Sequence, residues 1–323
     1  MTWFIGIDEA GYGPNLGPFV MTAVACRVPK ELAGTDLWSV LRRVVRRQGE
    51  TKRLESRIFV ADSKVVYSPK RGLKALEHGV LATLLHQECE PPATLDLLLE
   101  RFACEARTEL HGEPWYTGTT PLPFAVTAGA VRTFAEQFER LCRSQDIQWA
   151  PARVCAVCPP RFNRIVADSG TKGEVSGRAL QEVLPSLADL PPENENVRVL
   201  VDKHGGRNHY AALLQEAYPD SMVMVQCEGM ERSQYEIYGL GRQVRFAFQP
   251  RADSAHFCVA LASMISKYVR EMLMHEFNAF WQTQVPGLQP TAGYPTDAVR
   301  YWKEIQPAVE KLGLVESAVW RWR

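Results

Sequence analysis

The chain has 323 residues, of which 46% are hydrophobic and 23% charged. Its 37 basic and 37 acidic residues cancel, which argues against a protein that coats nucleic acid by net charge alone. No apolar run approaches the roughly 20 residues of a membrane span, and the N-terminus lacks the pattern of a secretory signal. Eight cysteines without such a signal are typical of reduced thiols. We therefore expect no membrane association and a cytoplasmic location.

The first 28 residues predict two adjacent strands. An apolar run over residues 2–10 ends in Asp8 and Glu9, and a second run covers residues 17–28. The glycines and prolines between the two runs favour a tight hairpin. The first run is typical of a central strand whose end carries a site.

A stretch rich in basic residues comes next, and segments with the apolar spacing of helices follow it. The densest basic stretch, LRRVVRRQGETKRLESR, covers residues 41–57. We interpret it as a solvated helix face in preference to a phosphate-contacting surface. Apolar spacing predicts a further helix over residues 70–87, and a helical insertion around 90–145 with helices at 94–110 and 127–143.

The second half alternates strands with helices. Strands are predicted at 152–158, 197–202, 223–227 and 244–250, with a helix around 175–187. Cys155 and Cys158 have the spacing of half a zinc knuckle, but we interpret them as part of a buried strand because no second close pair follows. Residues 253–281 predict a long helix capped by Asp253 with Ser254, before a C-terminal helical segment around 282–323.

This pattern predicts an α/β layered fold. No composition break divides the chain, so we expect a single domain over residues 1–323.

Carboxylates stand where regular structure ends. Asp8 with Glu9, Asp202 and Asp253 each follow or precede a predicted element. If the three positions converge, their repulsion calls for cations, and hard oxygen ligands suit Mg²⁺ or Mn²⁺. Two such ions ~4 Å apart are able to activate water and stabilise a leaving oxygen in phosphodiester hydrolysis. For any one acid alone, a local capping or strand-end role is the simpler interpretation.

Five segments, in the same order along the chain, resemble the ribonuclease HII family. GIDEAGYGPNLGPFVMTAV resembles its Asp-Glu strand end, glycine turn and Gly-Pro, and ADSKVVYSPKRGLKAL its Asp-Ser-Lys segment. VRVLVD is similar to the strand that carries the third acid. RADSAHFCVALASMISKYVREMLM resembles the fourth acid with its helix, and GYPTD the Gly-Tyr-x-Thr near the C-terminus.

The resemblance implies a ribonuclease H-like mixed sheet flanked by helices, with extra helical insertions. It makes Asp8, Glu9, Asp202 and Asp253 the ligands of a two-ion site for Mg²⁺ or Mn²⁺. The substrate-binding residues that it implies, together with residues next to these motifs that we assign to the substrate, are Gly11, Tyr12, Gly13, Ser63, Lys64, Lys203, His204, Arg207, Tyr294 and Thr296. Ser63 and Lys267 are equally suited to structural support and to substrate contact.

The chain departs from the family at two places. Tyr12 stands where the family has an arginine between two glycines, and Lys203, His204 and Arg207 replace the glycine after the third acid. The three basic residues fit phosphate contacts or counter-charges for the acids, and His204 also fits a proton carrier.

The resemblance implies an endonuclease that acts on the RNA strand of RNA/DNA hybrids or at ribonucleotides embedded in DNA, leaving a 3′-hydroxyl. Two alternatives stay open because of these departures. One is a nuclease of the same fold acting on branched DNA or duplex RNA, and the other is a noncatalytic nucleic-acid-binding protein. Trp320 and Trp322 fit packing on the body better than stacking on bases.

Overall fold

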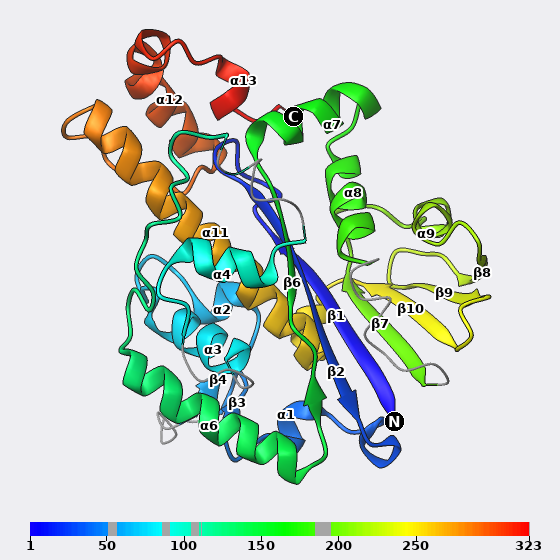
Figure 1. Ribbon diagram of the computed structural model, residues 1–323. Coiled ribbons are helices and arrows are strands. Elements are labelled where there is room, and N and C mark those ends of the chain that lie inside the picture. Colours follow the sequence, from blue (N-terminus) through cyan, green and yellow to red (C-terminus); the bar gives the residue numbers. More distant parts are fainter. Residues whose placement is uncertain (51–56, 86–90, 105–109, 111, 185–194, 323) are drawn as a thin grey trace.

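One mixed sheet forms the centre of the molecule (Figure 1). The computed structural model describes residues 1–50, 57–85, 91–104, 110, 112–184 and 195–322. Within them the eight strands run in the order β5-β2-β1-β7-β10-β9-β8, with β6 also paired to β2. Their bounds are β1 Thr2–Ala10, β2 Phe19–Val28, β5 Gln148–Trp149, β6 Arg153–Val157, β7 Asn196–Asp202, β8 Met222–Cys227, β9 Ser233–Tyr238 and β10 Val244–Gln249.

The strand β1 lies in the middle of this sheet. It pairs antiparallel with β2 and parallel with β7, and β7 pairs parallel with β10. Side chains alternate between the two faces, so Ile5 and Ile7 belong to one buried cluster while Phe4 packs against the other. Asp8 shares the face of Phe4, at the end of the strand.

Helices cover both faces of the sheet (Figure 1). The long helix α11 (Phe257–Gln284) crosses β1 and β2 on the Phe4 face, and α7, α8 and α9 pack on the other. The remaining bounds are α1 Leu37–Val40, α2 Ser63–Val66, α3 Lys74–Leu84, α4 Leu95–Phe102, α6 Ala128–Ser144, α7 Pro159–Ser169, α8 Gly173–Val183, α9 Ala211–Ala217, α10 Ala252–Ala255, α12 Pro295–Lys311 and α13 Glu316–Val319, with β3 Val45–Arg46 paired to β4 Ile58–Phe59 and the short 3-10 helix Lys30–Leu32.

Buried carboxylates anchor the segment around 90–145. Glu77 on α3 accepts hydrogen bonds from the amides of Phe124 (2.6 Å) and Val126 (2.9 Å) and from the Tyr268 hydroxyl (2.7 Å). On α11, Glu276 accepts hydrogen bonds from the amides of Gly118 (2.9 Å) and Thr120 (3.1 Å), which precede Phe124 in the same loop. These charge-assisted bonds tie the loop between α4 and α6 to both α3 and α11.

The predicted α/β fold with a mixed sheet flanked by helices is confirmed, as are the hairpin, the strands ending at Asp202 and Gln249, and helices in the predicted segments. Cys155 and Cys158 are buried at the end of β6, and no disulfide joins cysteines among the described residues. No helix in this part of the chain has the length and apolarity needed to cross a bilayer.

Three predictions were wrong in detail. Residues 41–50 form a turn and the short strand β3 instead of a helix, and residues 51–56 of the basic stretch lie outside the described residues. The long helix is broken at His256. Asp253 lies inside α10 instead of capping a helix, because the N-cap position belongs to Arg251 in the left-handed region (φ 56°).

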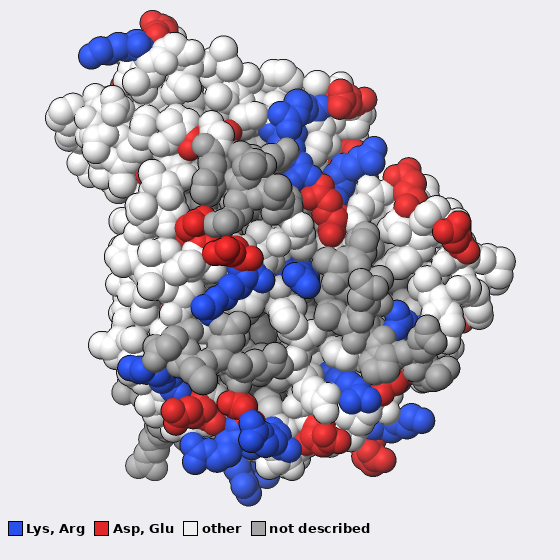
Figure 2. All heavy atoms as spheres, viewed as in Figure 1, with Lys and Arg blue, Asp and Glu red and all other residues white. Residues whose placement is uncertain are grey.

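The distribution of charged side chains on the surface agrees with the net charge of zero. On the face seen in Figure 2, basic and acidic side chains are interspersed over the molecule. Any attraction for a polyanion therefore depends on local groups of arginine and lysine.

Candidate active site

The parallel pairing of β1 and β7 brings two of the predicted acids together. Ile7 pairs with Val201, so Asp8 and Asp202 are the next residues on neighbouring strands. Adjacent strands lie about 4.8 Å apart and paired residues point to the same face. Asp202 is also paired with Gln249 at the end of β10. One edge of the sheet therefore carries both carboxylates.

A glycine in β1 allows the third segment to approach. A Cβ on Gly6 would lie 2.2 Å from the carbonyl carbon of Cys258 and 2.3 Å from the amide nitrogen of Val259. Only glycine fits where the start of α11 lies directly on the strand. The adjoining helix α10 is fixed by Asp202, whose Oδ1 accepts the amide of Ala252 at 2.7 Å. Asp253 follows this anchored residue and is buried.

Burial raises the pKa of all four predicted acids, and their mutual repulsion adds to the effect. The pKa of Asp8 is raised well above its ordinary value by burial and then by the charges of Glu9 and Asp202. Burial and the charge of Asp202 raise the pKa of Glu9 to about 8. Burial, then Asp62 and Asp202, raises the pKa of Asp253 to about 6, and burial also raises that of Asp202. The four acids are thus within electrostatic reach of one another.

The structure adds a fifth acid that the sequence analysis did not single out. The charge of Asp62 raises the pKa of both Asp202 and Asp253. Its carboxylate caps α2 by accepting the amide of Lys64 at 2.9 Å. The charge of Lys64 lowers the pKa of Glu9, Asp202 and Asp253, so this predicted substrate residue faces the acids. The signal for Asp62 was its place in the Asp-Ser-Lys segment.

The donor set fits a hard divalent cation. Its five acids offer carboxylate oxygens, which are the ligands that Mg²⁺ and Mn²⁺ favour. The Oε2 atom of Glu9 is buried and has no hydrogen-bond partner, which leaves it free to coordinate. In the positions that the described side chains occupy, no three His, Cys, Asp or Glu groups are gathered closely enough to hold an ion. The acids are neighbours, but they do not form a closed coordination sphere.

Two buried arginines hold the glycine turn beside the acids. Arg321 donates to the carbonyls of Gly11 (2.7 Å) and Pro14 (3.0 Å), and Arg270 donates to those of Leu16 and Pro18 at 3.2 Å. Gly11 has φ +90° and lies so close to Arg270 that a Cβ would meet its Nε at 2.6 Å. Sequence reasoning missed both arginines, because arginine in a sequence is usually exposed.

The other residues of the turn lie toward predicted substrate positions. A Cβ on Gly13 would lie 3.8 Å from a ring carbon of Tyr294, which is itself half exposed. Thr296 is exposed in the first turn of α12. The ring of Tyr12 is covered by Lys172 at 4.7 Å, and burial followed by the charge of Glu9 raises its pKa.

The basic residues after Asp202 have protein partners. Lys203 is buried and donates to Asn208 (2.8 Å) and to the carbonyl of Gly229. Arg207 forms an ion pair with Glu174 at 2.9 Å. These contacts favour a structural role for Lys203, and for Arg207 a role as counter-charge to Glu174, over direct phosphate contact.

His204 is sealed inside the molecule. It packs edge-on against Tyr210 and Phe248, and both ring nitrogens are buried without a partner among the described residues. Burial and then the charge of Arg207 lower its pKa to about 3. A neutral, enclosed ring serves packing, and this placement speaks against a proton carrier.

Ser63 and Lys267, whose roles the sequence analysis left undecided, both contact other side chains of the protein. Ser63 is buried and accepts a hydrogen bond from Ser263 at 3.0 Å, and Lys267 pairs with Glu271 on α11. At the C-terminus, Trp320 packs edge-on against Trp302, as expected, whereas Trp322 is 45% exposed.

Comparison with known proteins gives structural likeness only. Neither the scan against family models nor the search of curated proteins gives a match. Solved structures similar over nearly the whole chain include ribonucleases HII and HIII. The complex of PCNA and RNase HII from Archaeoglobus fulgidus matches with a TM-score of 0.43 and 18% identity, covering 99% of this chain and 94% of that one. Ribonuclease H2 from Pyrococcus horikoshii OT3 matches at 0.41 and 14%, covering 98% and 92%.

A further match is Bst-RNase HIII in complex with Mn²⁺, at TM-score 0.42 and 14% identity, covering 99% of this chain and 66% of that one.

Proposed function

We propose that the protein is a divalent-metal-dependent endonuclease that hydrolyses phosphodiester bonds. The observation that carries this proposal is the meeting of acids at one sheet edge: Asp8 and Asp202 end neighbouring strands, and Asp202 anchors the helix that presents Asp253. Buried carboxylates that repel one another are costly unless cations neutralise them. A purely structural role would not require so many mutually repelling carboxylates at one place.

Asp8, Glu9, Asp202 and Asp253 are the proposed ligands, with Asp62 beside them. Bound Mg²⁺ or Mn²⁺ would supply an activated water and charge stabilisation for phosphoryl chemistry. Lys64 faces the same acids and is placed to contact a phosphate of the substrate. The arginine-held turn at Gly11 and Gly13 keeps the adjoining backbone rigid for the approach of a strand.

We propose nucleic acid as the partner, with RNA/DNA hybrids or ribonucleotides embedded in DNA as the substrates. Support comes from the half-exposed Tyr294, which the family resemblance assigns to the sugar of a ribonucleotide. It lies beside Gly13, which the resemblance assigns to the scissile phosphate. Proteins distinguish RNA from DNA through the 2′-hydroxyl, and a tyrosine at this position suits such a contact.

A substrate panel tests the proposal. Purified protein with Mn²⁺ or Mg²⁺ is incubated with a labelled hybrid, a DNA duplex with one ribonucleotide, duplex RNA and branched DNA. We expect cleavage of the first two. Cleavage confined to duplex RNA or branched DNA would support a nuclease but contradict the proposed substrate. Binding of all four nucleic acids without cleavage in either Mn²⁺ or Mg²⁺ would refute the proposal that the protein is an enzyme.

A further inference from the structure

Rows of side chains cross the part of the sheet that α11 leaves uncovered. Asp202 and Gln249 belong to the row at the strand ends, and two residues back along each strand lie Leu200 and Ala247. A further two residues back, Arg198 pairs with Arg245 and also with Phe4 on β1. Because a strand rises about 3.3 Å per residue, the row of arginines lies about 13 Å from the row of acids.

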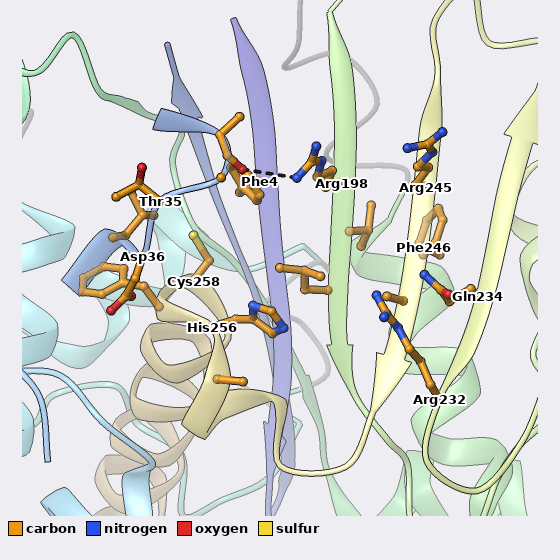
Figure 3. Close-up of a pocket in the computed structure, with 18 residues that line it drawn as sticks. Phe4, Thr35, Asp36, Arg198, Arg232, Gln234, Arg245, Phe246, His256 and Cys258 are labelled. Atoms are coloured by element: carbon orange, nitrogen blue, oxygen red, sulfur yellow. Dashed lines mark hydrogen bonds between the residues drawn. The ribbon is translucent and has the colours of Figure 1, made fainter. Parts of the chain in front are cut away.

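A hollow of about 550 Å³ opens over the arginine row. Figure 3 shows Arg198 and Arg245 side by side on β7 and β10, with Arg232 and His256 at the other end of the same space. Three arginines line the hollow against a single acid, Asp36. Like charges on neighbouring strands are unfavourable, so this row needs a source of negative charge.

The protein supplies only part of that charge. Arg245 pairs with Glu236 at 2.6 Å, whereas Arg198 donates to the carbonyl of Ala33 at 3.2 Å and lies over the Phe4 ring. Among the described residues, no carboxylate lies within ion-pair distance of Arg198 or Arg232.

The one acid of the hollow is already in use. Asp36 caps α1 by accepting the amide of Trp38 at 3.1 Å, and it pairs with Arg47 at 3.3 Å. The hollow is therefore left with an excess of positive charge.

The arginine hollow adjoins the acids. A second hollow of about 220 Å³ is lined by Arg47, Asp62, Asp253 and Ser254. The two hollows are neighbours along the chain, because Asp253 and Ser254 line the second and the next residues, Ala255 and His256, line the first. A strand that reaches Asp253 has a short path over the α10–α11 junction to Arg198 and Arg232.

We propose that the arginine hollow binds phosphates of the nucleic-acid strand that extends from the acid cluster. A nucleic-acid strand advances 3.4 Å along the helix axis per nucleotide, so the 13 Å between the rows corresponds to about four nucleotides. Exposed guanidinium groups suit phosphate oxygens because their planar donors match them in pairs. This inference rests on the proposed nucleic-acid substrate.

The test measures the salt dependence of binding without turnover. Anisotropy of a fluorescein-labelled 20-base-pair RNA/DNA hybrid is titrated in EDTA at several KCl concentrations. The variant Arg198→Gln/Arg232→Gln is compared with Arg143→Gln/Arg178→Gln, which removes two exposed charges from α6 and α8. Each lost phosphate contact lowers the slope of log Kd against log salt by about 0.9. We expect a slope smaller by about 1 to 2 for the hollow variant and no change for the control.

Two outcomes separate this inference from the proposed function. Equal slopes for wild type and the hollow variant would overturn the phosphate site, whatever the cleavage assay shows. A slope that is lower for the hollow variant than for wild type, with a wild type that never cleaves, would refute the nuclease and keep the site. If the double variant fails to fold by circular dichroism, Arg232→Glu, an exposed change just before β9, carries the same test, with a slope lowered by about 1.

Discussion

The contact between β1 and α11 allows the packing behind the site to be tested by one added methyl group. In Gly6→Ala the new Cβ would start 2.2 Å from the backbone of Cys258, whereas real Cβ contacts are essentially never below 3.0 Å. The start of α11 must therefore retreat by about 0.8 Å or more. Overpacking costs about 1–3 kcal/mol, and we expect the upper end because the neighbours are backbone atoms that cannot rotate away.

The assay is urea unfolding followed by tryptophan fluorescence. Gly129→Ala is the matched control, since Gly129 lies in α6 with nothing within 4 Å of its added Cβ. There the same change should stabilise by up to about 1 kcal/mol through helix propensity. Displacing the start of α11 should also shift the adjoining helix α10, move Asp253 away from Asp8 and weaken Mn²⁺ binding. A Gly6→Ala protein with the wild-type midpoint and Mn²⁺ affinity would refute the account of how the site is assembled.

Two further predictions concern buried carboxyl groups away from the site. Burial raises the pKa of Glu113 to about 8. Because the Glu113 carboxyl therefore holds its proton more tightly in the folded than in the unfolded state, the free energy of unfolding should fall as pH rises from about 4.5 to 8. Glu113→Gln should flatten this dependence in urea titrations, whereas the exposed Glu310→Gln should not, and parallel curves for wild type and Glu113→Gln would contradict the assignment. Glu77→Gln should cost about 2–4 kcal/mol because it weakens bonds to buried amides and to Tyr268. A loss below about 0.5 kcal/mol, equal to that of Glu139→Gln at a half-buried surface ion pair, would show that the carboxylate does not anchor the loop.

The strands that carry the acids were predictable from sequence, because continuous apolar runs that end in a carboxylate identify buried strands. Their convergence was not, since it depends on the β1–β7 register and on the close approach at Gly6. Helix α7 was not predicted, although it begins at two prolines and proline favours the first turn of a helix.

One strand and two site residues needed the structure. Strand β9 was not predicted, although SQYEIY alternates as a strand does. Arg270 and Arg321 look like surface residues in the sequence, and only the fold shows them buried beneath the glycine turn. The charges of Lys203 and Arg207 were visible, but their protein partners come from distant segments.

The central claim is that the acids hold divalent ions that cleave phosphodiester bonds. The most direct measurement is Mn²⁺-dependent cleavage of a labelled RNA/DNA hybrid by wild type, Asp8→Asn and Asp253→Asn, with the exposed Asp168→Asn as the control. We predict that either site variant loses activity by more than about a hundredfold and binds Mn²⁺ more weakly, while its circular dichroism and the control's activity match the wild type. Wild-type cleavage rates in both site variants would contradict the account.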